Sequence, residues 1–276
     1  MKNLVSLLVG VLFLLPAISQ RLDVVTFPSS EKSGSVNCYI LTSGKQSILV
    51  NAPMSARDAR RLTDTVTRLN RHLVGVFISG ARPEYYLGVA EIIKVFPLIK
   101  VMSTHDVAVE IAKSGPGMYD HYRSRLDADR PAPLILPDSI VENSINLENC
   151  HLELHSIGSE SNFQSILYEP KQRILFPGDI VNNKIHPDLA EHPAETMLKE
   201  LEELKKYSAY ELFPVYGPSS GGGGIENCIN YLQTFKRALM TNDSLAVFDI
   251  MNYYFPGYSM PGVLKRSIAK NIGVTQ

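Results

Sequence analysis

The sequence predicts a mixed α/β (α+β) fold in which two β-rich halves, each with its own helices, form a sandwich of two sheets covered by helices. Short apolar runs rich in β-branched residues alternate with amphipathic, helix-like segments along most of the chain. This alternation occurs in both halves, with no internal repeat and no low-complexity linker between them. We therefore expect one domain over residues 20–276.

The first half opens with two strands joined by a turn around Gly44. Ser55 then precedes a helical run and is followed three positions later by Asp58, the spacing of a helix N-terminal cap. After the next strand, a polar loop leads into a helix that ends near Phe96, and Thr104 is expected to cap the helix after that. The strands expected here are 36–41, 47–50, 73–79 and 100–102.

The second half has the same style. The strands expected here are 151–157, 165–168, 173–176 and 211–215. Residues 195–207 are an amphipathic helix rich in Leu, Glu and Lys, and residues 225–240 are expected to be the last long helix. Between the halves, residues 114–133 contain several Gly and Pro residues. We expect a lid over a pocket or a surface loop there, and the pattern does not separate the two.

Composition and charge exclude several functions. The 276-residue chain has 27 Lys plus Arg against 28 Asp plus Glu, a net charge of -1. A protein that binds nucleic acid through its phosphates needs a basic surface, so no nucleic-acid partner is expected. No apolar run beyond the N-terminus is long enough for a stable membrane span. The expected partner is an unidentified small molecule or protein.

The N-terminus resembles a cleaved signal peptide. Lys2 supplies a positive charge, residues 4–15 are mostly apolar, and Ala17 and Ser19 are the small residues that a signal peptidase recognises. The apolar run is short for a membrane anchor. We therefore expect residues 1–19 to be removed and the protein to be secreted, either extracellular or periplasmic.

Cysteine usage fits an exported protein with at most one disulfide. Cys38, Cys150 and Cys228 are the only cysteines, so two could pair and one would be left over. Their wide spacing, without a Cys-x-x-Cys motif, argues against a structural zinc site. Asn242 begins the sequon Asn-Asp-Ser and is an N-glycosylation candidate in a eukaryotic source.

Four segments carry a resemblance to a known family. Residues 77–88 read Phe-Ile-Ser-Gly-Ala-Arg-Pro-Glu-Tyr-Tyr-Leu-Gly, 176–179 read Phe-Pro-Gly-Asp, 186–192 read His-Pro-Asp-Leu-Ala-Glu-His, and 214–218 read Pro-Val-Tyr-Gly-Pro. In this order they resemble the metallo-β-lactamase superfamily, which has Thr-His-x-His-x-Asp-His-x-x-Gly, a strand-ending Gly-Asp and Pro-Gly-His-Gly-Pro. The resemblance implies a four-layer αββα sandwich with a pocket along one edge.

The resemblance also implies that the metal centre is lost. The histidine positions of the superfamily fall on Gly80, Arg82, Tyr85, Tyr216 and on or near Glu160, and the loop aspartate becomes Glu84. Only Asp179 is retained. Zinc and iron need neutral nitrogen and anionic oxygen ligands, which Gly and Arg do not provide. We expect no metal cofactor, with a hard divalent cation such as Mg²⁺ or Ca²⁺ on oxygen ligands as the alternative.

Arg82 suggests what replaces the metal. A permanent cation repels a divalent ion, whereas Glu84, Glu160 and Asp179 would repel one another in a metal-free cleft. Our hypothesis is that Arg82 stands where the metal would and holds these carboxylates in a salt-bridge network. The alternative is that Arg82 points into solvent from an eroded loop.

Four further side chains are candidates for the pocket. His186 and His192 lie in a segment that the resemblance places near the cleft, where each is either structural or able to bind ligand and transfer protons. Tyr85 and Tyr216 either line the pocket or fill the space that the missing metal and histidines leave. The sequence leaves these alternatives open.

Three functions are consistent with these residues. The first is a secreted, non-catalytic pseudoenzyme that binds a ligand. The second is a hydrolase of esters, thioesters, lactones or amides with a rewired site of Arg82, Glu84, Glu160 and Asp179, working with a hard metal or with none. The third is an extracellular structural or interaction module. The sequence does not decide whether the protein is an enzyme.

Overall fold

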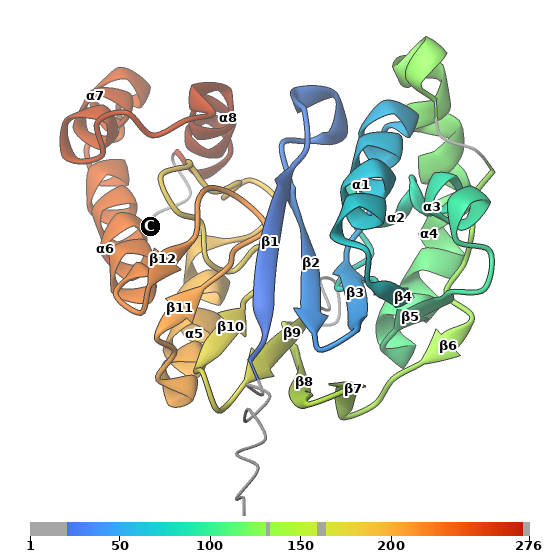
Figure 1. Ribbon diagram of the computed structural model, residues 1–276. Helices are drawn as coiled ribbons and strands as arrows, with labels where there is room; N and C mark the ends of the chain where they lie inside the picture. The colour runs from blue at the N-terminus through green and yellow to red at the C-terminus, as the bar shows by residue number, and fades with distance from the viewer. Residues whose placement is uncertain (1–20, 131–132, 159–163, 273–276) are drawn as a thin grey trace, which may run out of the picture.

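The computed structural model describes residues 21–130, 133–158 and 164–272. Two six-stranded sheets face each other, with strand orders β1-β2-β3-β4-β5-β6 and β12-β11-β10-β9-β8-β7. Helices α1 to α4 cover the outer face of the first sheet, and α5 and α6 cover that of the second (Figure 1). The expected αββα sandwich is confirmed.

The first sheet changes from antiparallel to parallel pairing at β3. Strands β1, β2 and β3 pair antiparallel, whereas β3 through β6 pair parallel. The strands are β1 (Asp23–Pro28), β2 (Asn37–Ser43), β3 (Gln46–Val50), β4 (His72–Phe77), β5 (Lys100–Ser103) and β6 (Ser139–Ile140). Because β3, β4 and β5 run parallel, their carboxyl ends lie at the same edge of the sheet. The loop after β4 begins at that edge.

The helices of the first half follow from caps and apolar stripes. Ser55 caps α1 as expected, because its Oγ accepts a hydrogen bond from the Asp58 N–H at 3.2 Å. The buried side chains of Leu62 and Val66 face the sheet. The helices are α1 (Ala56–Leu69), α2 (Pro83–Tyr86), α3 (Val89–Val95) and α4 (His105–Leu126), with short 3₁₀ turns at Glu31–Ser33 and Asp127–Asp129.

The second sheet is antiparallel except for the β10–β11 pair. Its strands are β7 (Ser144–Leu147), β8 (Cys150–Ile157), β9 (Gln164–Glu169), β10 (Ile174–Phe176), β11 (Glu211–Leu212) and β12 (Ser220–Gly221). The helices of this half are α5 (Ala194–Leu204), α6 (Gly224–Leu239), α7 (Ser244–Tyr254) and α8 (Pro261–Asn271), with a 3₁₀ turn at Lys205–Tyr207.

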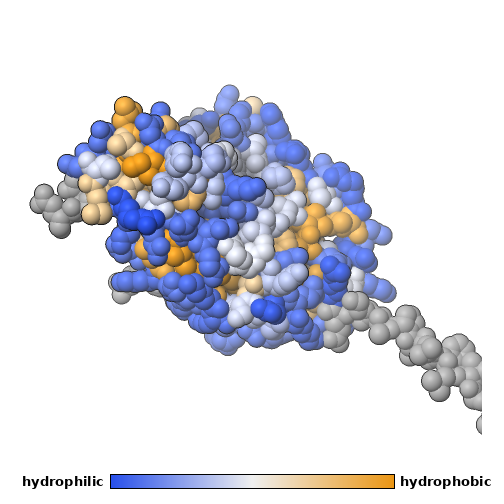
Figure 2. All heavy atoms as spheres, turned by 90° about the vertical axis from the view of Figure 1, so that its left-hand side faces the viewer, coloured by the Kyte–Doolittle hydropathy of each residue, from blue (hydrophilic) through white to orange (hydrophobic). Residues whose placement is uncertain are grey.

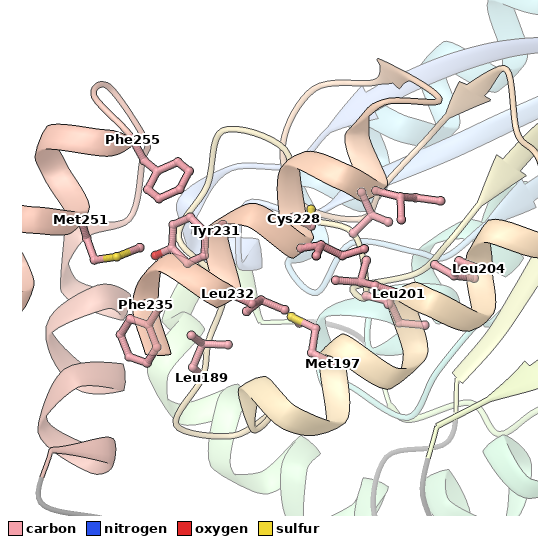
Figure 3. Close-up of a cluster of buried hydrophobic side chains, with 14 of the residues drawn as sticks. Leu189, Met197, Leu201, Leu204, Cys228, Tyr231, Leu232, Phe235, Met251 and Phe255 are labelled. Atoms are coloured by element: carbon pink, nitrogen blue, oxygen red, sulfur yellow. The ribbon is translucent and has the colours of Figure 1, made fainter. Parts of the chain in front are cut away.

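Three apolar clusters hold the layers together. Between the sheets, the Tyr39 ring contacts Phe176 and Phe213 with centroid distances of 5.3 and 5.7 Å. A second cluster lies between the first sheet and its helices. The third packs α5, α6 and α7 together and includes Met197 and Tyr231 (Figure 3). Met197 belongs to the third cluster and also lines the pocket, so this cluster packs behind one pocket wall.

Two expectations about helices are wrong. Residues 114–126 belong to the long helix α4, which continues through Pro116. Val107, Ile111 and Gly115 recur every four residues on its buried face, and this packing outweighs the cost of the proline. The helix at 225–240 is also not the last one, because α7 and α8 follow it, and α8 reaches the pocket edge.

Smaller expectations fail for local reasons. Thr104 precedes α4 but makes no side-chain cap; its hydroxyl lies 3.0 Å from the Ser165 hydroxyl on the opposite sheet. The strand at 211–215 is only two residues long, although the N–H groups of Phe213 and Val215 still donate to the Leu175 and Gly178 carbonyls on either side of Pro214. The three cysteines form no disulfide. They lie on β2, β8 and α6, which are different layers of the sandwich.

The outer surface beside α6 and α7 carries scattered apolar residues. Met240 and Leu245 are exposed there, and Figure 2 shows separate apolar patches among hydrophilic side chains on this face. Across the described residues, the helices include none with the length and apolar character needed to cross a membrane.

Candidate functional site

A cavity of about 340 Å³ lies where loops from both halves meet α8. The loop after β4 supplies Arg82, the loop after β10 supplies Asp179 and the histidines, and α8 supplies Val263 and Arg266. This volume is at the lower end of the range for small-molecule sites, about 300–1,000 Å³. The pocket therefore has room for a small organic molecule.

The structure brings most of the candidate residues into this one cavity. Its lining includes Arg82, Glu84, Asp179, His186 and Tyr216, together with His192. Tyr85 is fully buried and lies behind the wall rather than in it. Glu160 lies outside the described residues, so its place relative to the cavity stays an expectation.

Arg82 and Asp179 form the central ion pair of the pocket. Nε of Arg82 lies 2.7 Å from Oδ2 of Asp179, with 28% and 5% of the two side chains exposed. The Asp179 carboxylate raises the pKa of Arg82 above its ordinary value, so the guanidinium stays charged. Arg82 therefore faces the carboxylate and not the solvent, which agrees with the hypothesis drawn from the sequence.

The backbone around Asp179 is fixed by a tight turn. Gly178 has a φ of +64°, a conformation that favours glycine, and a Cβ there would lie 2.3 Å from Oε1 of Gln164. That same amide oxygen accepts a hydrogen bond from the Asp179 N–H at 3.0 Å. The Gly-Asp pair thus directs the carboxylate of Asp179 toward the cavity at the end of β10.

Glu84 is held by Tyr216 and not by Arg82. The Tyr216 hydroxyl donates a hydrogen bond to Oε1 of Glu84 at 2.9 Å. Burial, together with the charge of Glu84, raises the pKa of Tyr216, so the phenol keeps its proton and acts as the donor. The expected salt-bridge network is therefore present in part: Arg82 pairs with Asp179, whereas Glu84 receives a hydrogen bond from a neutral phenol.

Tyr85 fills the volume beside Gly80. A Cβ on Gly80 would lie 3.3 Å from Cε2 of Tyr85, so the missing side chain at residue 80 leaves the space that the aromatic ring uses. The Tyr85 hydroxyl is buried and has no hydrogen-bond partner among the described residues. Of the two alternatives for Tyr85, the structure shows the space-filling one.

His186 lies on the helical side of the pocket. Its Nδ1 is 2.7 Å from the Tyr231 hydroxyl on α6, and its Nε2 is buried without a partner in the described part of the chain. Burial lowers the pKa of His186 to about 4, so the ring is neutral at pH 7. A neutral imidazole has one donor and one acceptor nitrogen, so Nδ1 can pair with the Tyr231 hydroxyl in either tautomer.

His192 forms a second buried pair. Its Nε2 lies 2.7 Å from Oε2 of Glu200 on α5, and both side chains are almost fully buried. Sequence reasoning missed Glu200, although a signal was available. The residue lies next to Leu201 and three positions after Met197, on the apolar face of its helix, where a carboxylate needs a specific partner.

The residues of α8 were also missed. Val263 lines the pocket, and Arg266 pairs with Asp188 at its rim. Helix α8 reaches this position through buried contacts of Leu264 and Ile268. No motif points to a pocket from this segment, since only tertiary packing brings it there.

The site does not fit the metal centre of the family that the sequence resembles. No group of three or more His, Cys, Asp or Glu side chains in the described residues is placed to hold a metal ion. The retained carboxylate, Asp179, is paired with a guanidinium, whose charge opposes a divalent cation. The chemistry available to the described pocket comes from two arginines, three lining carboxylates, two imidazoles and two phenols.

Comparisons with known proteins support the fold. No protein-family model matches the chain, and a search of curated proteins finds no relative. Among solved structures, a metallo-β-lactamase from Pontibacter korlensis covers 77% of this chain and 99% of its own at 16% identity, with a TM-score of 0.59. The metallo-β-lactamase IND-7 aligns over 79% of this chain and 96% of its own at 19% identity, with a TM-score of 0.59.

A third similar structure is the metallo-β-lactamase FIM-1 from Pseudomonas aeruginosa in its mono-zinc form. It covers 79% of this chain and 98% of its own at 14% identity, with a TM-score of 0.55. The chain therefore has the metallo-β-lactamase fold, and the resemblance seen in the sequence is confirmed at that level. Activity does not follow from the fold, because function depends on the residues of the site.

Proposed function

We propose that this protein is a secreted, non-catalytic binding protein that holds a small molecule in a metal-free pocket of the metallo-β-lactamase fold. The observation that carries the proposal is the Arg82–Asp179 ion pair in the wall of a 340 Å³ cavity. The guanidinium supplies the positive charge that a metal would supply, so the charge of the carboxylate is balanced without one.

The pocket lining supports ligand binding. Ile185, Met197 and Val263 offer apolar contact, while the ion pair and His186 offer fixed polar groups. A mostly concave surface with a few placed polar groups is typical of small-molecule sites. The third hypothesis, a purely structural module, gains no comparable support from these contacts.

A metal-free hydrolase is the second candidate, and the His192–Glu200 pair favours it. A buried carboxylate close to an imidazole beside a pocket is an arrangement that a general base can use. In that case His192 would take a proton from water as the water attacks a carbonyl carbon, and would return it to the leaving group.

A fragment screen by ligand-observed NMR tests the binding proposal, with the mature protein after treatment with EDTA. We expect small organic fragments to bind, and Val263→Trp, which fills the cavity, to abolish their binding. Val109→Trp, at an exposed position of α4, is the matched control and should leave binding intact. Fragments that bind equally well to the Val263→Trp variant would place the ligand elsewhere.

The hydrolase candidate has its own test. p-Nitrophenyl acetate turnover that is lost in both His192→Gln and Glu200→Gln, while fragment binding persists, would replace the non-catalytic proposal with the enzyme. We expect turnover no faster than in buffer that contains an equal concentration of free imidazole.

A further inference from the structure

The charges that line the pocket do not balance. Its three carboxylates are Glu84, Asp179 and Asp188, and its two guanidinium groups are Arg82 and Arg266. Arg82 pairs with Asp179, and Arg266 pairs with Asp188. Glu84 forms no salt bridge with a described residue; among these residues its side-chain hydrogen bond comes from the neutral phenol of Tyr216.

The imidazoles do not supply the missing positive charge. His186 is neutral at pH 7, since burial lowers its pKa to about 4. His192 is paired with Glu200, a further carboxylate, so a protonated His192 would only neutralise that partner. One negative charge at Glu84 is left uncompensated in the described pocket.

A second observation points to the same region. Oδ1 of Asp179 is buried and has no hydrogen-bond partner among the described residues, although the residue lines the pocket and is only 4% exposed. An ionised carboxylate normally accepts several hydrogen bonds, and an unmet one is costly in the interior. The site thus lacks a donor at Asp179 as well as a positive charge at Glu84.

The two carboxylates belong to one neighbourhood. Both act electrostatically on Arg82, and both act on Tyr216. The rings of Tyr122 and Tyr216 line the same cavity. Aromatic faces attract organic cations, and the combination of aromatic rings with a carboxylate is a common way to bind an ammonium group.

We propose that the ligand is a small organic amine, whose ammonium group lies against Glu84 and Asp179 beside Tyr122 and Tyr216, with its apolar part against Met197 and Val263. The inference rests on the proposed function of the pocket and names its ligand class. An ammonium carries one positive charge and three donors, which match the charge and the donor that the site lacks. A divalent ion fits less well, because Arg82 repels it.

Isothermal titration with three probes of similar shape tests this inference: phenethylamine, phenethyl alcohol and hydrocinnamate, at pH 7 and low ionic strength. We expect the amine to bind at least about tenfold more tightly than the alcohol, since charge-assisted hydrogen bonds are stronger than neutral ones. Glu84→Gln should remove this preference. Glu226→Gln, an exposed change on α6, is the matched control and should keep it.

Salt dependence gives a second readout that needs no variant. Raising the ionic strength should weaken amine binding several-fold and leave the alcohol unchanged. Equal or tighter binding of the alcohol or hydrocinnamate would overturn the amine assignment while the binding pocket stands. Stabilisation by Mg²⁺ or Ca²⁺ that Glu84→Gln abolishes would also overturn it. If none of the probes binds and the fragment screen is empty, the proposed function fails as well.

Discussion

Nε of Arg82 lies 2.7 Å from Oδ2 of Asp179, so a guanidinium pairs with the carboxylate that the sequence resemblance aligns with a metal-bridging aspartate. The Asp179 side chain is almost fully buried, whereas the Arg82 side chain keeps some exposure. A buried carboxylate without its cation is strongly destabilising. The ion pair therefore makes Arg82 both a structural residue and an obstacle to metal binding, and the predictions below follow from it.

Replacing Arg82 by Ala should destabilise the protein by about 3 kcal/mol, the lower end of the range for breaking a buried ion pair, because Arg82 keeps some exposure. Urea unfolding followed by circular dichroism measures this. Arg57→Ala is the matched control, because Arg57 is an exposed arginine paired with the buried Asp129, which keeps Lys32 as a second partner. The control should cost less than about 1 kcal/mol. If Arg82→Ala unfolds like the parent, the ion pair does not stabilise the fold.

Replacing Arg82 by His should create weak zinc binding. The variant removes the repelling cation and adds an imidazole close to Asp179 and Glu84, which gives three ligands of the kinds that zinc accepts. Melting temperatures with Zn²⁺ and with EDTA should differ for this variant. Arg82→Gln removes the charge but adds no imidazole, so its melting temperatures should differ less. An equal difference in the two variants would show that the new imidazole does not bind zinc.

The two tyrosines should respond differently to loss of their hydroxyl groups. Tyr216→Phe removes the hydrogen bond to Glu84 and should cost about 1–2 kcal/mol. Tyr85→Phe removes a buried hydroxyl without a partner among the described residues and should be neutral or slightly stabilising. Thermal unfolding of both variants under the same conditions measures the contrast. A larger loss in Tyr85→Phe than in Tyr216→Phe contradicts this account of the site.

His186 should make stability depend on pH. Its pKa is about 4 in the folded protein, below the ordinary value of 6.5, so the unfolded chain binds the extra proton between these values. The free energy of unfolding is therefore highest above pH 6.5. It falls by at most about 3 kcal/mol as the pH decreases toward 4. His186→Gln should flatten the stability profile in this window. His72→Gln, at an exposed position, is the control and should leave the pH dependence of stability unchanged. If both variants show the same pH dependence, groups other than His186 cause it.

Much of the fold follows from local patterns in the sequence. The Ser55–Asp58 spacing correctly located the start of α1, and the apolar run before Ser79 located β4. Helix α7 was missed although Asp243 caps it by accepting hydrogen bonds from the Leu245 and Ala246 N–H groups. Such a cap is visible in the sequence as Asn-Asp-Ser, where the same residues also form a glycosylation sequon.

The candidate site was predictable only where a motif fixed the chain. Arg82, Asp179 and Tyr216 were placed by the resemblance of their segments to family motifs, and all three line the cavity. Tyr231 and Glu200 could not be placed, because each reaches a histidine from a different helix through tertiary packing. Residues around Pro116 form helix α4 and not the expected loop for the same reason. Buried contacts outweigh the low helix propensity of these residues.

The most direct test of the metal-free account is the metal content of the purified mature protein, with melting temperatures in EDTA, Zn²⁺, Mg²⁺ and Ca²⁺. We expect less than stoichiometric metal and the same melting temperature in all four conditions, because Arg82 already neutralises Asp179 and repels a divalent cation. Stoichiometric bound metal, or clear stabilisation by one ion, would contradict this account and make a metal-dependent hydrolase the leading function.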